Sequence, residues 1–408
     1  MKKKSKKKTR RSRGRSPKAV PGEAAGLTLL GSNTKYASPP PAVSPEQKGW
    51  DNRAERYELQ AIARYLLTNE GRKKGLTFVH NVHRTAKCLY VPLGLTRIKR
   101  GLVGAAFYAH LPICGSVWVC AVCTSKVQSK RRKEIARAIE WAYKNGLKCI
   151  MVTLTFPHYI WHLLKDLVKK MRKALTKLRS GKKWQKLMKR FGFAGLIRSL
   201  ELTYGINGWN LHTHELWLIS KDADAVLLQY EIMKKWAQCC AAVGLLDPSD
   251  PAMVAAFSLR SVDVKDWVSS SEYLAKQDDM RRWGIDNELA SSSTKNGKLS
   301  GRHPFALLKT ATISNEDGRL FIEYAEAMTG KRQIFWSHGL KGKVGLKDLV
   351  DKALALDTRD PADSLAILSR DQWRMIIKEN ARAKILEIAE SEGIDGIHAW
   401  FEERALAA

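Results

Sequence analysis

The chain lacks any long apolar stretch, and this absence excludes several classes of protein. No run of about eighteen or more apolar residues occurs in its 408 residues, so no segment is predicted to span a bilayer. The first segment, Met1–Lys18, is basic, but no apolar stretch follows it, which argues against a secretory signal. Neither end carries a lipidation motif. We therefore expect a cytoplasmic protein with no membrane partner.

Acidic residues and cysteines are also scarce. The 40 acidic residues are outnumbered by 71 lysines and arginines, which gives a formal net charge of +31. A surface this positive attracts polyanions, and nucleic acid is the expected partner. Seven cysteines in a chain this long do not form a disulfide framework, so they indicate free thiols and a metal site. The 13 tryptophans and 44% hydrophobic residues are enough for a sizeable core.

Composition divides the chain into four predicted regions. These are a disordered basic tail at 1–48, a helical region with clustered cysteines at 49–145, a mixed region of strands and helices at 146–345, and a C-terminal helical region at 346–408. The tail cannot bury enough apolar surface to fold. It either grips phosphates without sequence choice or only adds solubility.

Apolar periodicity predicts individual elements within these regions. The expected helices are 54–67, 125–143, 163–178 and 226–243, and the expected strands are 147–156, 195–204 and 210–219. Residues 321–335 are expected to form a closing strand pair or a strand with a turn. In the last region, Ser369 and Gln372 form a predicted capping box at the start of a helix.

Two histidines on one predicted strand indicate a metal site. His212 and His214 are two residues apart, so their side chains leave the same face of the strand. A turn centred at Ile206–Asn207 places Glu201 directly opposite His212 and on the same face. Two imidazoles and a carboxylate suit Mn²⁺, and with waters they also suit Mg²⁺. The alternative is that both histidines only make structural hydrogen bonds.

Tyr273 and Lys276 are a candidate nucleophile and its neighbour. They are three residues apart in a predicted helix, so they lie on one face. A phenol is a weak nucleophile at neutral pH unless a metal or a cation assists it. The pair alone is equally consistent with an ordinary packed tyrosine, and it becomes informative only beside the histidine hairpin.

Basic residues cover one side of the helix predicted over 163–178. Leu167, Met171 and Leu175 form its apolar face, and only Asp166 offsets the surrounding positive charge. Such a run is often just a solvated face, but here it favours contacts to phosphates. The predicted DNA-binding residues are Lys169, Lys170, Arg172, Lys173 and Lys177.

Four cysteines are candidate ligands of a structural zinc ion. Cys120 and Cys123 have the Cys-x2-Cys spacing of a zinc knuckle, and Cys114 precedes them. Cys88 completes the set, with His110 as the alternative fourth ligand if Cys88 is too distant. Four buried, inert thiols are the competing interpretation.

Together these motifs resemble the plasmid rolling-circle replication initiators (Rep proteins) of the HUH endonuclease superfamily. The segments similar to the three family motifs are Met151–Phe156, Gly208–His214 and Tyr273–Lys276, in that order, and the block Cys114–Cys123 is similar to a cysteine block that precedes them. The resemblance covers roughly residues 88–345. It implies an α+β fold with a central antiparallel sheet and helices on one face. An N-terminal zinc-binding region at 49–145, a catalytic domain at 146–345 and C-terminal helices would complete it.

The resemblance also implies a reaction. Tyr273 would attack one phosphodiester of single-stranded or extruded origin DNA, giving a 5′-phosphotyrosyl enzyme and a free 3′-OH. A host polymerase, with a host helicase, would extend that end. Some relatives carry a glutamate one helical turn before the tyrosine, but Ser269 stands there and the adjacent Glu272 points elsewhere. How the cycle ends is therefore not predicted.

Two other functions are compatible with the same residues. One is an HUH transposase or relaxase, which keeps the chemistry in a different process. The other is a non-catalytic, zinc-containing nucleic-acid-binding protein. The sequence does not predict the origin sequence or the oligomeric state.

Overall fold

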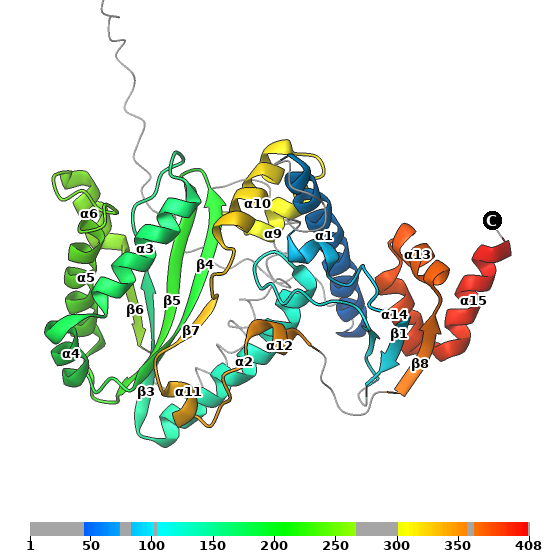
Figure 1. Cartoon of the computed structure of the whole chain (residues 1–408). Coiled ribbons are helices and arrows are strands. Elements are labelled where there is room, and N and C mark those ends of the chain that lie inside the picture. The colour runs from blue at the N-terminus through cyan, green and yellow to red at the C-terminus, as the bar shows by residue number, and fades with distance from the viewer. Residues whose placement is uncertain (1–44, 74–82, 102–103, 267–300, 357–362, 407–408) are drawn as a thin grey trace, which may run out of the picture.

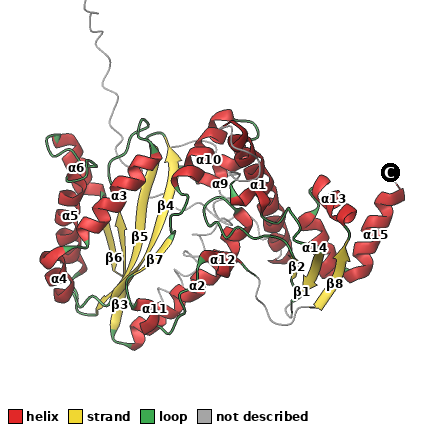
Figure 2. Ribbon diagram, in the orientation of Figure 1, coloured by secondary structure: helices red, strands yellow, loops and turns green. Residues whose placement is uncertain are grey.

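The computed structural model describes residues 45–73, 83–101, 104–266, 301–356 and 363–406. These residues form two antiparallel β-sheets, with helices packed around each and between them (Figures 1 and 2). None of the helices in these ranges is long and apolar enough to cross a membrane.

The larger sheet has five strands in the order β6-β3-β5-β4-β7, all antiparallel. The strands are β3 (Leu147–Leu154), β4 (Gly195–Gly205), β5 (Gly208–Ser220), β6 (Val262–Asp266) and β7 (Ile334–Trp336). β5 is the longest of these strands and lies at the centre of the sheet. One of its faces can therefore be buried in the core while the other carries functional side chains.

The hairpin of β4 and β5 has the predicted register. Glu201 pairs with His212, and Gly205 pairs with Gly208 across the turn. Gly208 has a φ of +82°, and a Cβ there would lie 2.8 Å from the Cα of Ile160. Both the backbone conformation and the close approach of the preceding loop therefore require glycine at this position.

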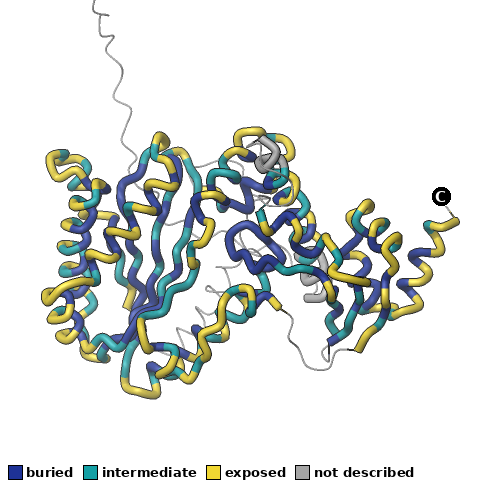
Figure 3. Tube along the Cα trace, in the orientation of Figure 1, coloured by how far each residue is buried: buried dark blue, intermediate teal, exposed yellow. Residues whose placement is uncertain are grey.

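Helices cover one face of the larger sheet completely. Their bounds are α3 (Leu164–Leu178), α4 (Gly181–Arg190), α5 (Ala225–Ala241) and α6 (Pro251–Arg260). Their apolar residues join Val152 and Trp217 in one core, which appears dark blue in Figure 3. The rings of Trp184 on α4 and Trp217 meet edge to face, with centroids 5.7 Å apart.

Among the described residues, only part of the opposite face is covered. Ile135 and Ile139 of α2 (Ala121–Lys144) pack against Leu216 and Leu218 of β5, and Leu340 of α11 (Leu340–Lys343) joins them. Because side chains alternate, Leu216 and Leu218 share their face with the two histidines of β5. The α+β class with a central antiparallel sheet is confirmed, and the structure adds helices on this second face.

The prediction of a strand pair over 321–335 is wrong for most of that stretch. Residues Asn315–Ala327 form α10, after α9 (Pro304–Thr310), and only β7 is a strand. The Ser314 side chain accepts a hydrogen bond from the Asp317 N–H and caps α10. Phe321, Tyr324 and Ala325 are buried at helical spacing, so the apolar pattern has a period of three to four and not two.

A smaller sheet joins the two ends of the described chain. Its order is β2-β1-β8, and α14 and α15 pack beside it, whereas α12 packs on α2. The bounds of these and the remaining elements are α1 (Pro45–Lys73), η1 (Arg84–Lys87), β1 (Thr96–Arg100), β2 (Ala106–Ala109), α12 (Asp351–Ala355), β8 (Asp363–Leu368), α13 (Arg370–Lys378), α14 (Arg382–Ser391) and α15 (Gly393–Leu406). The predicted capping box at Ser369 and Gln372 is confirmed. The prediction that the C-terminal region is entirely helical is wrong for strand β8. So short a strand depends on pairing with β1, which is distant in the sequence, and local patterns do not reveal that pairing.

Arg382, the first residue of α14, connects this helix to α1 at a buried position. Its guanidinium donates to Gln60 Oε1 at 2.7 Å and to the Tyr90 hydroxyl at 2.7 Å, and also reaches the carbonyls of Tyr57 and Leu89. It lies 3.9 Å from the centroid of the Tyr90 ring. Carbonyls and aromatic faces thus replace water around a fully buried cation.

We expect Arg382→Met to lower the free energy of unfolding by about 3 kcal/mol, because it leaves buried carbonyls without donors. The control is Arg374→Met on α13, whose side chain is 77% exposed. That change should alter the free energy by less than about 0.5 kcal/mol. Urea denaturation followed by circular dichroism measures both values, and equal effects would contradict a structural role for Arg382.

Candidate active site and metal clusters

The β4–β5 hairpin brings Glu201, His212 and His214 together on the open face of the larger sheet. Glu201 Oε2 lies 3.6 Å from His212 Nε2 and 3.5 Å from His214 Nε2. One ligand atom from each residue fits within 4.8 Å of the others, so the three could hold one metal ion. This is the cluster that the alternation of β5 and the predicted register place together.

Hydrogen bonds on the far side of each ring orient the two imidazoles. His214 Nδ1 lies 3.0 Å from the Thr153 hydroxyl on β3, and His212 Nδ1 lies 3.4 Å from the Asn210 carbonyl oxygen. Both Nε2 atoms are thereby directed at Glu201. Such outer contacts fix the ring orientation and the tautomer in histidine metal sites.

The protonation states suit cation binding at neutral pH. Burial alone would raise the pKa of Glu201, but His214 and His212 lower it to about 2. Burial lowers the pKa of His214, against the opposing effect of Glu201. The carboxylate is therefore ionised and the His214 ring neutral near pH 7, so both have lone pairs available. The three side chains are 15–28% exposed, which leaves room for further ligands.

Two further residues of this face were not predicted from the sequence. His158 is buried just beyond the end of β3, and its pKa is lowered mainly by burial and also by the nearby His212. Asp263 on β6 pairs with Thr153 and interacts electrostatically with His214. Neither residue carried a sequence signal of its own: His158 follows the end of β3, and Asp263 lies near the start of the edge strand β6, which β3 separates from the histidine strand.

The predicted nucleophile and its neighbour, Tyr273 and Lys276, lie outside the described residues. The described chain stops at Asp266, the end of β6, and starts again at Gly301. Arg302 then pairs with Tyr204, its N–H donating to the Tyr204 carbonyl at 2.7 Å. The residues on either side of 267–300 are thus attached to the sheet that carries Glu201, His212 and His214.

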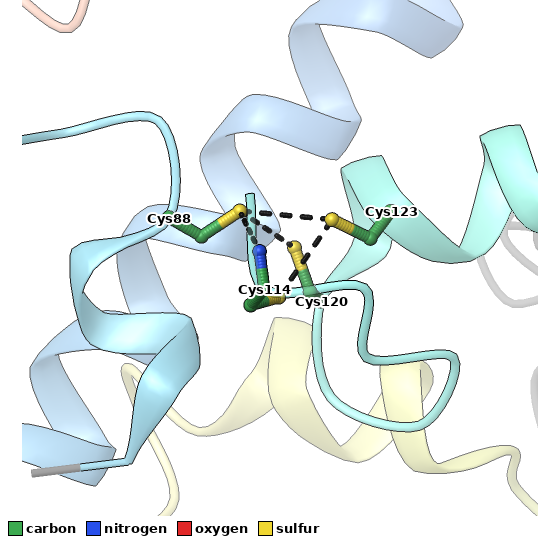
Figure 4. Close-up of side chains that lie close together, drawn as sticks. All are labelled: Cys88, Cys114, Cys120 and Cys123. Carbon is green, nitrogen blue, oxygen red and sulfur yellow. Dashed lines mark hydrogen bonds between the residues drawn. The ribbon is translucent and has the colours of Figure 1, made fainter. Parts of the chain in front are cut away.

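Cys88, Cys114, Cys120 and Cys123 form a second cluster, which is buried (Figure 4). The Cys88–Cys123 and Cys114–Cys123 sulfurs are 3.6 Å apart, and the Cys88–Cys120 sulfurs are 3.9 Å apart. Ligands at about 2.3 Å around a tetrahedral ion would be about 3.8 Å apart, whereas a disulfide requires about 2.05 Å. The spacing fits a shared metal ion.

Donors around the sulfurs support the same interpretation. Gln60 Nε2 donates to Cys120 Sγ at 3.3 Å, and the Cys114 N–H donates to Cys88 Sγ at 3.4 Å. Hydrogen bonds of this kind stabilise thiolates, the form in which cysteine binds metals. Cys88 is the fourth member of the cluster, whereas the alternative, His110, is exposed.

The predicted DNA-binding residues lie on the other side of the sheet from the histidines. Lys169, Arg172, Lys173 and Lys177 are exposed on α3, and Lys170 is half-buried with its Nζ donating to the Gly244 carbonyl. A groove between α4 and α5 continues this basic surface. Its lining includes Lys183, Lys186, Arg190, Lys234 and Lys235.

Comparisons with known proteins indicate a likeness to replication proteins. Residues 110–243 match the model of the family described as Replication protein (Rep_1). The chain is 28% identical over 363 residues to "Protein rep" of Streptomyces lividans, covering 72% of this chain and 78% of that protein. It is also 28% identical over 145 residues to a "Neomycin resistance protein" of Streptomyces cyanogenus, covering 29% and 33%. No solved structure matches significantly. The resemblance to plasmid replication initiators is confirmed.

We expect Thr153→Val to weaken Mn²⁺ binding about tenfold, because it removes the partner that orients His214. Thr155→Val is the matched control, since the Thr155 hydroxyl has no hydrogen-bond partner among the described residues. Titration calorimetry with Mn²⁺ measures both affinities. If the two variants bind equally well, the Thr153 contact does not position the site.

Proposed function

We propose that this replication protein nicks one strand of origin DNA and so starts rolling-circle replication. The observation that carries the proposal is the Glu201–His212–His214 cluster, which is partly exposed on the less covered face of the sheet. The chemistry of its donors fits Mg²⁺ or Mn²⁺, and a bound ion would polarise the scissile phosphodiester. The family match and the motif order support the same reaction.

In the proposed step, the Tyr273 oxygen attacks phosphorus while the bond from phosphorus to the 3′-oxygen breaks. The phenol loses its proton, and the departing 3′-oxygen gains one and becomes a free 3′-OH. The 5′-phosphate stays on Tyr273, so the same site can later rejoin a strand. Lys276, one turn away in the predicted helix, would stabilise the negative charge on the tyrosinate or the phosphate.

The length of chain after β6 allows Tyr273 to reach the cluster. Asp266 pairs with Ile150, which pairs with Trp217, three residues along β5 from His214. Crossing to the gap between β5 and β4 and moving along the strand amounts to roughly 20 Å. If the predicted helix begins at Tyr273 and the residues before it are extended, the seven residues from Asp266 to Tyr273 span at most about 24 Å. The chain between Asp266 and Tyr273 is therefore long enough for Tyr273 to reach the metal cluster.

The basic surface on α3, α4 and α5 suggests how the rest of the DNA is held. Because it lies behind the sheet, it suits duplex phosphates beside the nick, contacted without sequence choice. We propose that Lys169, Lys170, Arg172, Lys173 and Lys177 make such contacts. A host helicase and polymerase would then act on the open strand and its 3′-OH, in the cytoplasm.

We further propose that the four-cysteine cluster holds zinc as a structural ion. Purified protein should contain about one zinc per chain by inductively coupled plasma mass spectrometry. Cys120→Ser should lose that zinc and lower the unfolding temperature. Cys240→Ser is the control, because Cys240 is equally buried but lies outside the cluster. Full zinc occupancy in the Cys120 variant would contradict the assignment.

We expect wild-type protein with Mn²⁺ to form an SDS-resistant adduct with a labelled single strand from its own replicon, and Tyr273→Phe to form none. Tyr230→Phe, an exposed tyrosine on α5, is the matched control and should retain the adduct. His212→Ala should reduce cleavage at least about a hundredfold while strand binding is largely kept.

The adduct experiment also separates the alternatives. No adduct with wild type, across divalent metals and strands tiled over the replicon, would contradict the nicking proposal and favour a binding protein. An adduct whose 3′-OH cannot be extended by a polymerase would favour a strand-transfer role such as transposition.

A further inference from the structure

The loop between β3 and α3 exposes an unusual group of apolar side chains. Trp161 is 72% exposed, Ile160 60% and Leu163 64%. The rings of Tyr159 and Trp161 stack in parallel, with centroids 4.7 Å apart, and His162 contacts both rings edge-on. A contiguous exposed patch of this kind marks a surface that meets a partner.

The loop is closed by internal hydrogen bonds and anchored at its C-terminal end. The Tyr159 N–H donates to His162 Nδ1 at 3.2 Å, and the His162 N–H donates to the Tyr159 carbonyl at 3.0 Å. At its end, the Leu164 N–H donates to Glu323, whose other oxygen accepts from Trp209 Nε1 at 2.9 Å. The stacked rings are therefore presented from a fixed backbone, so little order is lost when a ligand binds.

The patch lies at the turn end of the hairpin that carries the metal cluster. The backbone of Ile160 abuts Gly208, and Ile206 at the turn is itself 66% exposed. Gly208 is four residues before His212 on β5, which is about 13 Å along the strand. Within the loop, His158 interacts electrostatically with His212.

We propose that Tyr159 and Trp161 form a stacking platform for unpaired bases of the strand that enters the metal cluster. The inference rests on the proposed nicking function and adds how the strand is positioned. Flat aromatic faces accept any base, and base–aromatic stacking is the usual way in which proteins hold single strands. The exposed Lys165 follows on α3 and provides positive charge for the backbone, while Asp250 is an acid near Tyr159.

A single strand of DNA explains an exposed aromatic patch on the hairpin of the metal cluster better than a duplex, a protein partner or a lipid surface does. Duplex DNA keeps its base faces stacked inside and offers none to Trp161. A protein partner would not require proximity to the metal cluster, and a lipid surface would compete with the DNA for the same face. The platform thus selects unpaired DNA at the point where the phosphodiester must be exposed.

The test is fluorescence anisotropy with a labelled mixed-sequence single strand and with the duplex of the same sequence. Trp161→Ala should weaken single-strand binding at least about fivefold, Trp161→Phe should recover most of it, and duplex binding should not change. The slope of affinity against salt should stay the same, because no phosphate contact is lost. Tyr65→Ala on α1, a 66% exposed tyrosine, is the matched control and should bind normally.

Single-strand binding by Trp161→Ala equal to that of Tyr65→Ala would overturn the platform. Equal weakening of single-strand and duplex binding by Trp161→Ala would also overturn it. In a separate assay with anionic vesicles, a Trp161→Ala variant that loses vesicle binding but keeps single-strand binding would overturn it too. These readouts do not depend on cleavage. If wild type forms no covalent adduct but Trp161→Ala still loses single-strand affinity, nicking fails and the platform stands.

Discussion

The pairing of β4 with β5 in one register is the constraint on which the rest of the site depends. Glu201 faces His212 only in this register, and a slip by one residue would turn the histidines into the core. The opposite face of β5 prevents that slip, because Thr213, Glu215 and Trp217 are fully buried there. Glu215 accepts hydrogen bonds from Trp217 and from Arg179, the residue after α3, so the buried face is specified by charge as well as by packing. The site is therefore the outer side of a strand whose inner side is fixed.

The two clusters are linked through α2. Cys123 lies in the first turn of this helix, and Ile139, near its other end, packs under the same face of the sheet that carries the histidines. The cysteine loop is also joined to α10, because the Tyr324 hydroxyl donates to the Trp118 carbonyl at 3.0 Å. An ion held by the four cysteines would set the position of α2 and so the boundary of the open surface. Structural and catalytic roles would thus be divided between two metal sites that differ in exposure and in ligand type.

The parts predictable from sequence were those that depend on local spacing. The alternation of His212 and His214, the glycine-bounded turn opposite Glu201 and the Cys-x2-Cys motif are short-range patterns, and each led to the correct neighbours. The parts that failed depend on distant partners. Strand β8 exists because β1 pairs with it from far along the chain, and α10 was mistaken for strands although Ser314 caps it. Asp263 and His158 lacked a motif, since only the sheet places them near the histidines.

In the proposed reaction, one divalent ion would lie between the β4–β5 hairpin and the DNA backbone. Electron–nuclear double resonance on Mn²⁺ bound to the full chain, with a strand that cannot be cleaved, tests it most directly. We expect ¹⁴N couplings from the imidazoles of His212 and His214 together with a ³¹P coupling from one phosphate. Mn²⁺ that shows no imidazole coupling, or that shows both nitrogens but never phosphorus, would contradict it.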